Sequence, residues 1–239
     1  MNGHFEENMT FDNSVGRGWG EQIAELSQLI LYLQGRKRKG TKLANIRIWE
    51  HCIDEAIDVL DEVVGLKICF CTVCKTKTSQ GYELCVKNIL KIQHDTSDEN
   101  SCYTDEDKAK YGLLIAILMF IYMMHRPGSS NYSVSENSLK SFLKEMGIAE
   151  NSCFGNQTDL NKLFGATYTA EFISQGWLAF TKRTDESGCD TVTYEWGHRA
   201  KSVIDPMEIL QAYCTMDGSA PHHWGLHYRE AHNAVARDS

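Results

Sequence analysis

Residues 164–213 read FGATYTAEFISQGWLAFTKRTDESGCDTVTYEWGHRAKSVIDPMEILQAY, and this stretch decides the fold. A helical segment is expected to end at Gly176, because glycine commonly terminates helices. An aromatic-led strand follows over 177–183, and a polar turn containing Gly188 leads to a second strand over 191–196. This order predicts a helix followed by a β-hairpin.

The second strand of this hairpin has one apolar face. Val192, Tyr194 and Trp196 alternate with polar residues, so they share one side of the strand. Asp205 is expected to cap the next helix, with Pro206 at its first position, where the missing N–H of proline is harmless. A helix followed by a two-stranded wing is typical of the end of a winged-helix domain.

The first ninety residues predict the same order of elements. A basic loop separates a helix over 20–34 from a short helix that Thr41 can cap, and a third helix is expected over 51–64. Two strands, 66–74 and 82–88, follow as a hairpin. The apolar residues of the first helix recur with a period of about 3.6 residues: Ile23, Leu26, Leu29, Ile30 and Leu33.

The pattern then repeats after an acidic, solvated linker at 94–107. A core helix is expected over 107–125, a helix with a capping box at Ser133–Glu136 runs to residue 146, and a helical segment from Thr158 breaks at Gly165. The chain is therefore predicted to be a mainly helical α+β protein with two tandem winged-helix modules. The expected divisions are a disordered or loosely attached N-terminus (1–19), the first module (20–92), the linker (93–106), the second module (107–216) and a C-terminal tail (217–239).

Composition excludes several classes of function. With a net charge of −8, the chain of 239 residues is not a polycation that coats nucleic acid, so any DNA contact must be local. The apolar run at 111–124 is too short for a membrane span, which needs about 20 residues, and no membrane association is expected. The polar, acidic first residues are unlike a secretory signal, so the nine cysteines are expected to be reduced, in cytosol or nucleus.

Two groups of residues raise the question of a metal. Cys69, Cys71 and Cys74, with Cys85 on the partner strand, could supply thiolates to zinc or could be buried free cysteines. Strand geometry holds these thiols in a line rather than a tetrahedron, which favours burial. The second group is histidines 222, 223, 227 and 232 in the polar tail, where no carboxylate or thiolate completes a ligand set and a solvated tail is favoured. We expect no metal, cofactor or catalytic residue.

Charge on the third helix of each module argues against reading of DNA sequence. The helix over 51–64 carries five acids, and the segment 167–175 has Glu171 but no lysine or arginine, so a sequence-specific transcription factor is disfavoured. One basic cluster follows the first helix. It could contact phosphates without sequence preference, or be a solvated loop that balances nearby acids. Its members are Arg36, Lys37, Arg38, Lys39 and Lys42.

Over about residues 20–216 the sequence resembles the MAGE (melanoma antigen) homology domain family. The landmarks are YGLLIAILMFIYM at 111–123, Phe154-Gly155 with leucines 160 and 163, and the string YEWGHRA at 194–200. In the first module, LSQLILYLQ and VVGLKI followed by GYELCV are similar to the first winged helix of the family.

The resemblance implies a non-catalytic adaptor that binds a RING-type ubiquitin ligase subunit. It further implies a nuclear subunit of the SMC five-six complex, or one also found in the cytoplasm, that contacts a kleisin, binds double-stranded DNA weakly and assists DNA repair. The alternative is an adaptor for another RING ligase without a chromosome role. In this family a dileucine pair of the first helix binds the RING partner, which maps onto Leu29-Ile30 here, so the expected RING-binding residues are Leu26, Leu29, Ile30 and Leu33. Ordinary core packing of this stripe is the other interpretation.

Overall fold

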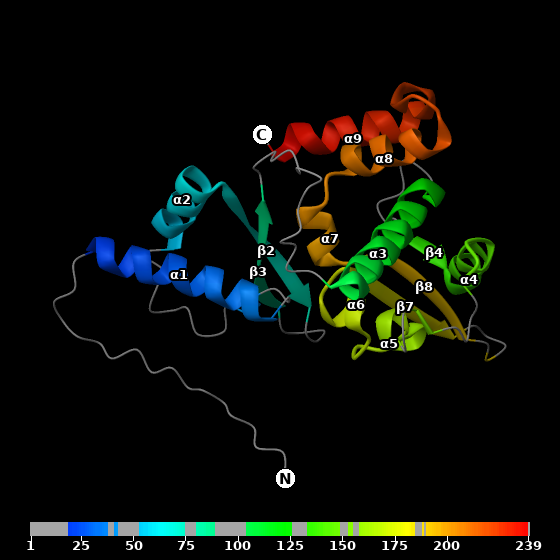
Figure 1. The fold of residues 1–239 in the computed structure, drawn as a ribbon, viewed down its shortest axis with the longest axis horizontal. Coiled ribbons are helices and arrows are strands. Elements are labelled where there is room, and N and C mark those ends of the chain that lie inside the picture. The colour runs from blue at the N-terminus through cyan, green and yellow to red at the C-terminus, as the bar shows by residue number, and fades with distance from the viewer. Residues whose placement is uncertain are drawn as a thin grey trace, which may run out of the picture.

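Two small antiparallel sheets, each accompanied by helices, organise the chain in a computed structural model. The structure describes residues 19–37, 41–42, 53–74, 80–88, 104–125, 133–148, 153–154, 158–184, 188 and 190–238. Figure 1 shows α1, α2 and the β2–β3 hairpin at one end of the molecule, and α3 to α6 with the second sheet at the other. The predicted fold class, mainly helical α+β with two winged modules, is confirmed.

The first module comprises α1 (Trp19–Lys37), α2 (Ile53–Val64) and a sheet of order β1-β3-β2. Strands β2 (Leu66–Cys74) and β3 (Gln80–Asn88) form the predicted hairpin, with Cys69 opposite Cys85. The helix expected from Thr41 is wrong at its start, because Thr41 and Lys42 form β1 against Leu84 and Glu83 of β3. The rest of that expected helix lies outside the described residues. A strand of two residues has no periodicity that a sequence could display.

A small apolar core holds the first module together. Leu26 and Ile30 of α1 are 1% and 2% exposed, and they pack with residues of α2 and β2. Burying such side chains stabilises the fold by about 1.5–3 kcal/mol each, so this helix stripe is needed for folding. The other buried members of the cluster are Ala56, Leu60 and Ile68.

The second module is built around α3 (Asp105–Met124), which crosses the sheet β4-β8-β7. Strands β7 (Leu178–Thr184) and β8 (Asp190–Trp196) form the predicted wing, and β4 (Ser133–Ser135) pairs with the other side of β8. The remaining elements are α4 (Glu136–Glu145), β5 (Cys153–Phe154), β6 (Thr158–Asp159), α5 (Leu160–Phe164), α6 (Glu171–Ser174), α7 (His198–Val203), α8 (Pro206–Asp217), the 3₁₀ helix η2 (Pro221–Trp224) and α9 (Gly225–Asp238).

Helix starts follow their caps, with two shifts from expectation. Asp205 accepts a hydrogen bond from Met207 N at 2.8 Å and Pro206 begins α8, as predicted. Helix α4 begins at Glu136 and is capped by Ser135, the last residue of β4, which accepts from Ser138 N at 3.1 Å; Ser133 lies two residues earlier, at the start of that strand. Similarly, Asp159 rather than Thr158 caps α5. In both cases the cap is the last residue of a short strand, so the helix begins directly where the strand pairing ends.

Helix α7 lies between the β2–β3 hairpin and the second sheet, so it joins the two modules (Figure 1). Its Ser202 carbonyl accepts a weak hydrogen bond from the Cys69 thiol, with a sulfur–oxygen distance of 3.7 Å. The family landmark at 194–200 thus runs from the wing into the joint between modules.

The polar, solvated tail expected after residue 216 is wrong for residues 221–238, which form η2 and α9 against α8. Trp224 is half-buried, His227 is buried and Ala231 has no exposed surface. These residues are spaced by three and four, so they make a helical stripe. The stripe escaped detection because its central residue is a histidine, which counts as polar in a sequence pattern.

Candidate partner-binding surfaces

Some apolar residues of helix α1 are buried in the core, and others are half-buried or exposed to solvent. Leu26 and Ile30 point into the core, whereas Leu29 is only half-buried and Leu31 is 36% exposed. The core interpretation therefore holds for Leu26 and Ile30, and only the flanks of the stripe are open to a partner. Binding of a RING subunit by this helix stays a prediction, and the side chain of Leu33 lies outside the described residues.

The basic cluster is only partly within the described chain. Arg36 and Lys37 occupy the last turn of α1, and Lys42 lies in β1 opposite Glu83. Arg38 and Lys39, and the side chains of the other three, lie outside the described residues. The backbone of α1 contacts β1, which in turn pairs with β3. Contact of the cluster with DNA stays a prediction.

Acidic surfaces cover the helices that would have to enter a DNA groove. On α2 four of the five acids are exposed: Asp54, Glu55, Asp58 and Glu62. In the second module the helix before the wing is α6, which has only 4 residues. A helix of about one turn cannot span the base edges that a recognition helix reads. Both observations argue against sequence-specific recognition.

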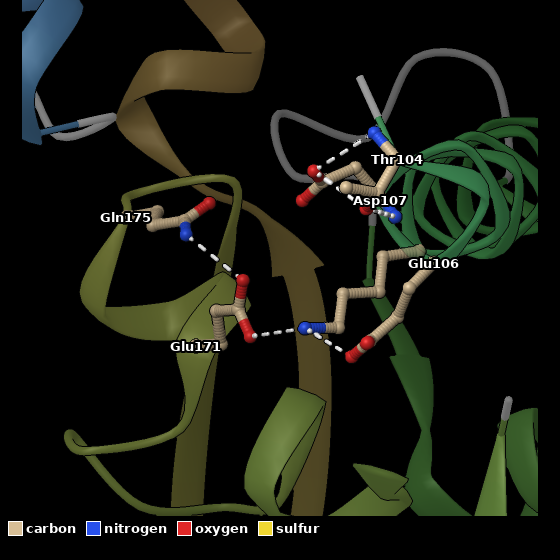
Figure 2. Close-up of polar contacts among 6 residues, drawn as sticks. Thr104, Glu106, Asp107, Glu171 and Gln175 are labelled. Atoms are coloured by element: carbon tan, nitrogen blue, oxygen red, sulfur yellow. Dashed lines mark hydrogen bonds and ion pairs between the residues drawn. The ribbon is translucent and has the colours of Figure 1, made fainter. Parts of the chain in front are cut away.

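The α6 helix is instead tied to the start of α3 by a polar network (Figure 2). The Lys110 ammonium lies 3.1 Å from Glu106 and 3.7 Å from Glu171, and Gln175 Nε2 donates to Glu171 at 3.2 Å. Burial alone would lower the pKa of Lys110, but the hydrogen bond to Glu106 and the surrounding carboxylates raise it above its usual value. The lysine therefore stays charged, and the network positions α6 rather than a substrate.

The family landmark at 194–200 performs a structural task. Trp196 Nε1 donates to the Leu118 carbonyl of α3 at 2.8 Å, which fixes the wing on the core helix. Gly197 N donates to Trp177 O at 2.8 Å, and the Arg199 guanidinium lies 4.4 Å from the Trp177 ring centroid, within cation–π range. Every one of these contacts holds the second sheet to α3 and α7.

Cysteines and histidines are the candidate metal ligands of this chain. Cys85 is fully buried and Cys69 is half-buried, which fits the interpretation as small hydrophobic residues. Across the described ranges, no group of three or more histidine, cysteine, aspartate or glutamate side chains could hold a metal ion. The side chains of Cys71 and Cys74 lie outside those ranges, so the absence of zinc stays a prediction. Within the described part of the chain, no helix has the length and hydropathy that crossing a bilayer requires.

Two histidines dock α9 on the end of α3. The side chain of His125 has no exposed surface, and its Nε2 lies 3.0 Å from Glu230 Oε2. The His227 ring packs edge-on to His125 with centroids 6.1 Å apart, and Tyr122 Oη donates to the His227 carbonyl at 3.1 Å. The pKa of His227 is lowered, mainly by burial and secondly by the nearby His125. These two effects outweigh that of Glu230, which acts to raise the pKa.

Acidification is therefore expected to loosen α9. Because the pKa of His227 is lower in the folded state, unfolding takes up a proton, and stability falls as the pH drops below about 6.5, the usual histidine value. Hydrogen exchange of the α9 amides at pH 7.5 and 5.5 would measure the change. His227→Phe should weaken the pH dependence, whereas His232→Gln, on the exposed side of α9, should leave it intact. An equal response in both variants would contradict the assignment.

Comparison with known proteins decides the family. A model of the MAGE homology domain matches residues 46–207, more than half of the chain. This chain belongs to the MAGE homology domain family. Human melanoma-associated antigen D2 is 30% identical over 149 residues, covering 61% of this chain but only 22% of that protein. Human melanoma-associated antigen F1 is 23% identical over 220 residues, covering 87% of this MAGE chain and 64% of that protein.

A solved structure supports the fold. A chain of the Nse1-Nse3-Nse4 complex superposes with a TM-score of 0.66 at 22% identity, covering 90% of this MAGE chain and 97% of that chain. At this level of identity the match demonstrates the shared architecture of two winged modules. The landmark at 194–200 and the core helix α3 lie within the family match, so their contacts explain why the family pattern folds.

Proposed function

We propose that this MAGE chain is a non-catalytic adaptor subunit of an SMC five-six complex. In this role it binds a RING-type ubiquitin ligase subunit through the first module and a kleisin through the second. It works in the nucleus in DNA repair, recombination and chromosome maintenance, and touches double-stranded DNA weakly. The alternative is a MAGE adaptor of another RING ligase that has no chromosome role.

One observation carries this proposal. The chain shares its fold, over almost its whole length, with a chain of a complex named for three different proteins. An adaptor between two partners needs two separate surfaces, and the two modules provide them. The polar clusters described above support a non-catalytic role, because their charged side chains have structural tasks. The Lys110 network and the His125–Glu230 pair each connect helices within the second module.

Co-purification tests the proposal directly. The tagged chain is purified from its own cells under mild salt, and the recovered proteins are identified by mass spectrometry. Recovery of a RING protein together with a kleisin and SMC subunits is expected. Recovery of a RING protein alone would favour the adaptor without a chromosome role, and recovery of neither would overturn both.

Neutralising the basic cluster is expected to weaken DNA binding. The variant Arg38→Gln with Lys39→Gln should lower affinity for duplexes of any sequence and reduce the slope of log affinity against log salt by up to about 2, since each phosphate contact contributes about 0.9. The matched control is Lys140→Gln with Lys144→Gln on α4, which removes the same charge elsewhere. Fluorescence anisotropy at several salt concentrations measures both. Equal loss in the two variants would mean that only net charge matters.

A further inference from the structure

A shallow groove lies between strand β7 and the turn before α6, away from α1 and the basic cluster. It has a volume of about 660 Å³. Its lining combines small residues of the turn, two aromatic rings and a single charged side chain. The lining residues are Ala166, Thr167, Tyr168, Phe180, Thr181 and Lys182. The RING contact proposed on α1 does not use this groove, which belongs to the second module.

The wall of this groove is an open sheet edge. Among the described residues, strand β7 pairs with β8 alone in the order β4-β8-β7, and no described strand pairs with its other side. Gly197 N donates a hydrogen bond to the opposite residue, at Trp177 O. Because hydrogen-bonded and non-hydrogen-bonded pairs alternate along antiparallel strands, the backbones of residues 179, 181 and 183 form hydrogen bonds with β8. The backbone groups of Phe180 and Lys182 therefore point outward. Among the described residues, no backbone group of another element bonds to them.

An exposed aromatic ring stands over this edge. Tyr168 is 82% exposed although its ring lies 5.0 Å from the Phe180 ring. Its turn is fixed by hydrogen bonds from Thr167 N to Gly165 O at 2.6 Å and from Ala170 N to Thr167 O at 3.2 Å. A rigid turn that exposes a large aromatic surface is preorganised for binding, because little conformational freedom is lost when a ligand covers it.

The charge of the groove indicates what kind of ligand fits. Lys182 Nζ lies 6.0 Å from the centroid of the Phe180 ring, and Lys182 is the one charged residue among those that line the groove. On a chain with a net charge of −8, a groove whose one charge is positive favours an acidic ligand. Outward N–H and C=O groups that alternate along the edge match the backbone of an extended peptide rather than a nucleic acid.

We propose that the β7 edge binds an extended, acidic peptide segment of a partner protein by strand addition. The segment pairs with the outward backbone groups of Phe180 and Lys182. It packs an aromatic or branched apolar side chain against the exposed ring of Tyr168, which already contacts Phe180, and places a carboxylate near Lys182. This surface is separate from the RING contact proposed on α1, and its test with the purified chain requires neither adaptor partner.

The test uses the full chain, labelled with ¹⁵N, and one defined probe. The probe is an acetylated and amidated nonapeptide of sequence EDVEFEVDE, compared with its charge-reversed form KKVKFKVKK. Binding of the acidic probe should shift the amide signals of β7 and protect the Phe180 and Lys182 amides from hydrogen exchange. The charge-reversed peptide should not do so. No shift on β7 at millimolar probe would overturn the proposal.

Side-chain variants locate the probe. Tyr168→Ala is expected to weaken binding about tenfold, the usual effect of losing one aromatic contact, without changing the melting temperature. Lys182→Glu should also weaken binding, and the loss of affinity should be larger at low salt than at high salt, because salt screens the charges. Tyr228→Ala, which removes a 38% exposed ring from α9, is the matched control. Equal affinity of the Tyr168→Ala and wild-type chains would overturn the assignment.

A second pair of variants separates backbone pairing from charge. Lys182→Ala removes the charge alone, whereas Lys182→Pro also removes an outward N–H, a change that edge strands tolerate. Strand addition predicts weaker binding to the proline variant than to the alanine variant. If the proline variant fails to fold, the exchange protection of the wild-type Phe180 and Lys182 amides decides the question.

Other occupants give different results, and each would overturn the peptide proposal. A single-stranded oligothymidine that binds with the same dependence on Tyr168, while the acidic peptide does not bind, would assign the groove to nucleic acid. A concentration-dependent dimer in sedimentation, lost in Tyr168→Ala, would assign it to a second copy of this chain.

Discussion

Replacing Gly197 with alanine is expected to destabilise the second module by about 3 kcal/mol or more, the upper end of the cost of overpacking. An added Cβ would overlap the Gly176 carbonyl oxygen and lie 2.7 Å from its carbon and 2.9 Å from Trp177 C. These neighbours are backbone atoms at the start of β7, so no side chain can rotate away. To relieve this overlap the two backbone segments would have to move apart, which would break the hydrogen bond from Gly197 N to Trp177 O.

A second glycine provides the control. Gly225, at the start of α9, has helical backbone angles, and a Cβ added there would meet no atom within 4 Å. Gly225→Ala should be neutral or stabilising by up to about 1 kcal/mol, because alanine is the better helix former. Thermal or urea unfolding of both variants measures the difference. If Gly197→Ala unfolds within about 1 kcal/mol of the wild type, the backbones must separate more easily than this packing implies.

This close approach explains the family landmark in physical terms. Trp196 must reach the Leu118 carbonyl, Gly197 must allow the strand to pass Gly176, and Ala200 of α7 is fully buried. Each of these three positions is therefore restricted by size or by a hydrogen bond. The string at 194–200, which lies within the family match, joins the wing to the core helix in this chain.

The main elements of the fold could be predicted from the sequence because their signals are local. The wing follows from alternating residues and glycine turns, and α8 follows from Asp205 and Pro206. The short strands β1 and β4 could not be predicted, since they exist only through pairing with β3 and β8, which are distant in the chain. Helix α9 was missed for the related reason that tertiary packing, including contacts with Tyr122 and His125, makes His227 a buried residue.

The candidate surfaces were less accessible to sequence reasoning. Periodicity identifies the apolar stripe of α1 but cannot separate its centre from its flanks, and that difference decides which residues a partner can reach. The groove at Tyr168 was missed because the segment before Gly176 predicts continuous helix. In the structure α6 starts only at Glu171, and the preceding turn exposes the ring. The signal that could have indicated a turn is the pair of threonines on either side of Tyr168.

Burial on α1 gives the last prediction, which separates folding from partner binding. Ile30→Ala should destabilise the first module by about 2–5 kcal/mol, because a 2% exposed side chain leaves a cavity in a small core. That variant should lose RING binding only because the helix no longer holds its place on α2. Unfolding monitored at Trp19 and Trp49, the two tryptophans of the first module, measures the loss.

Leu29→Ala addresses the partner contact itself. Leu29 lies half-buried on one flank of the stripe, so its truncation should leave the unfolding midpoint nearly unchanged, while loss of an interface anchor weakens RING binding by about 30-fold or more. Leu31→Ala is the matched control, because residues two apart on a helix face different sides. Titration calorimetry with the purified RING subunit distinguishes them. Equal weakening by both variants would place the partner across the whole exposed side of α1, and no weakening by Leu29→Ala would remove this flank from the interface.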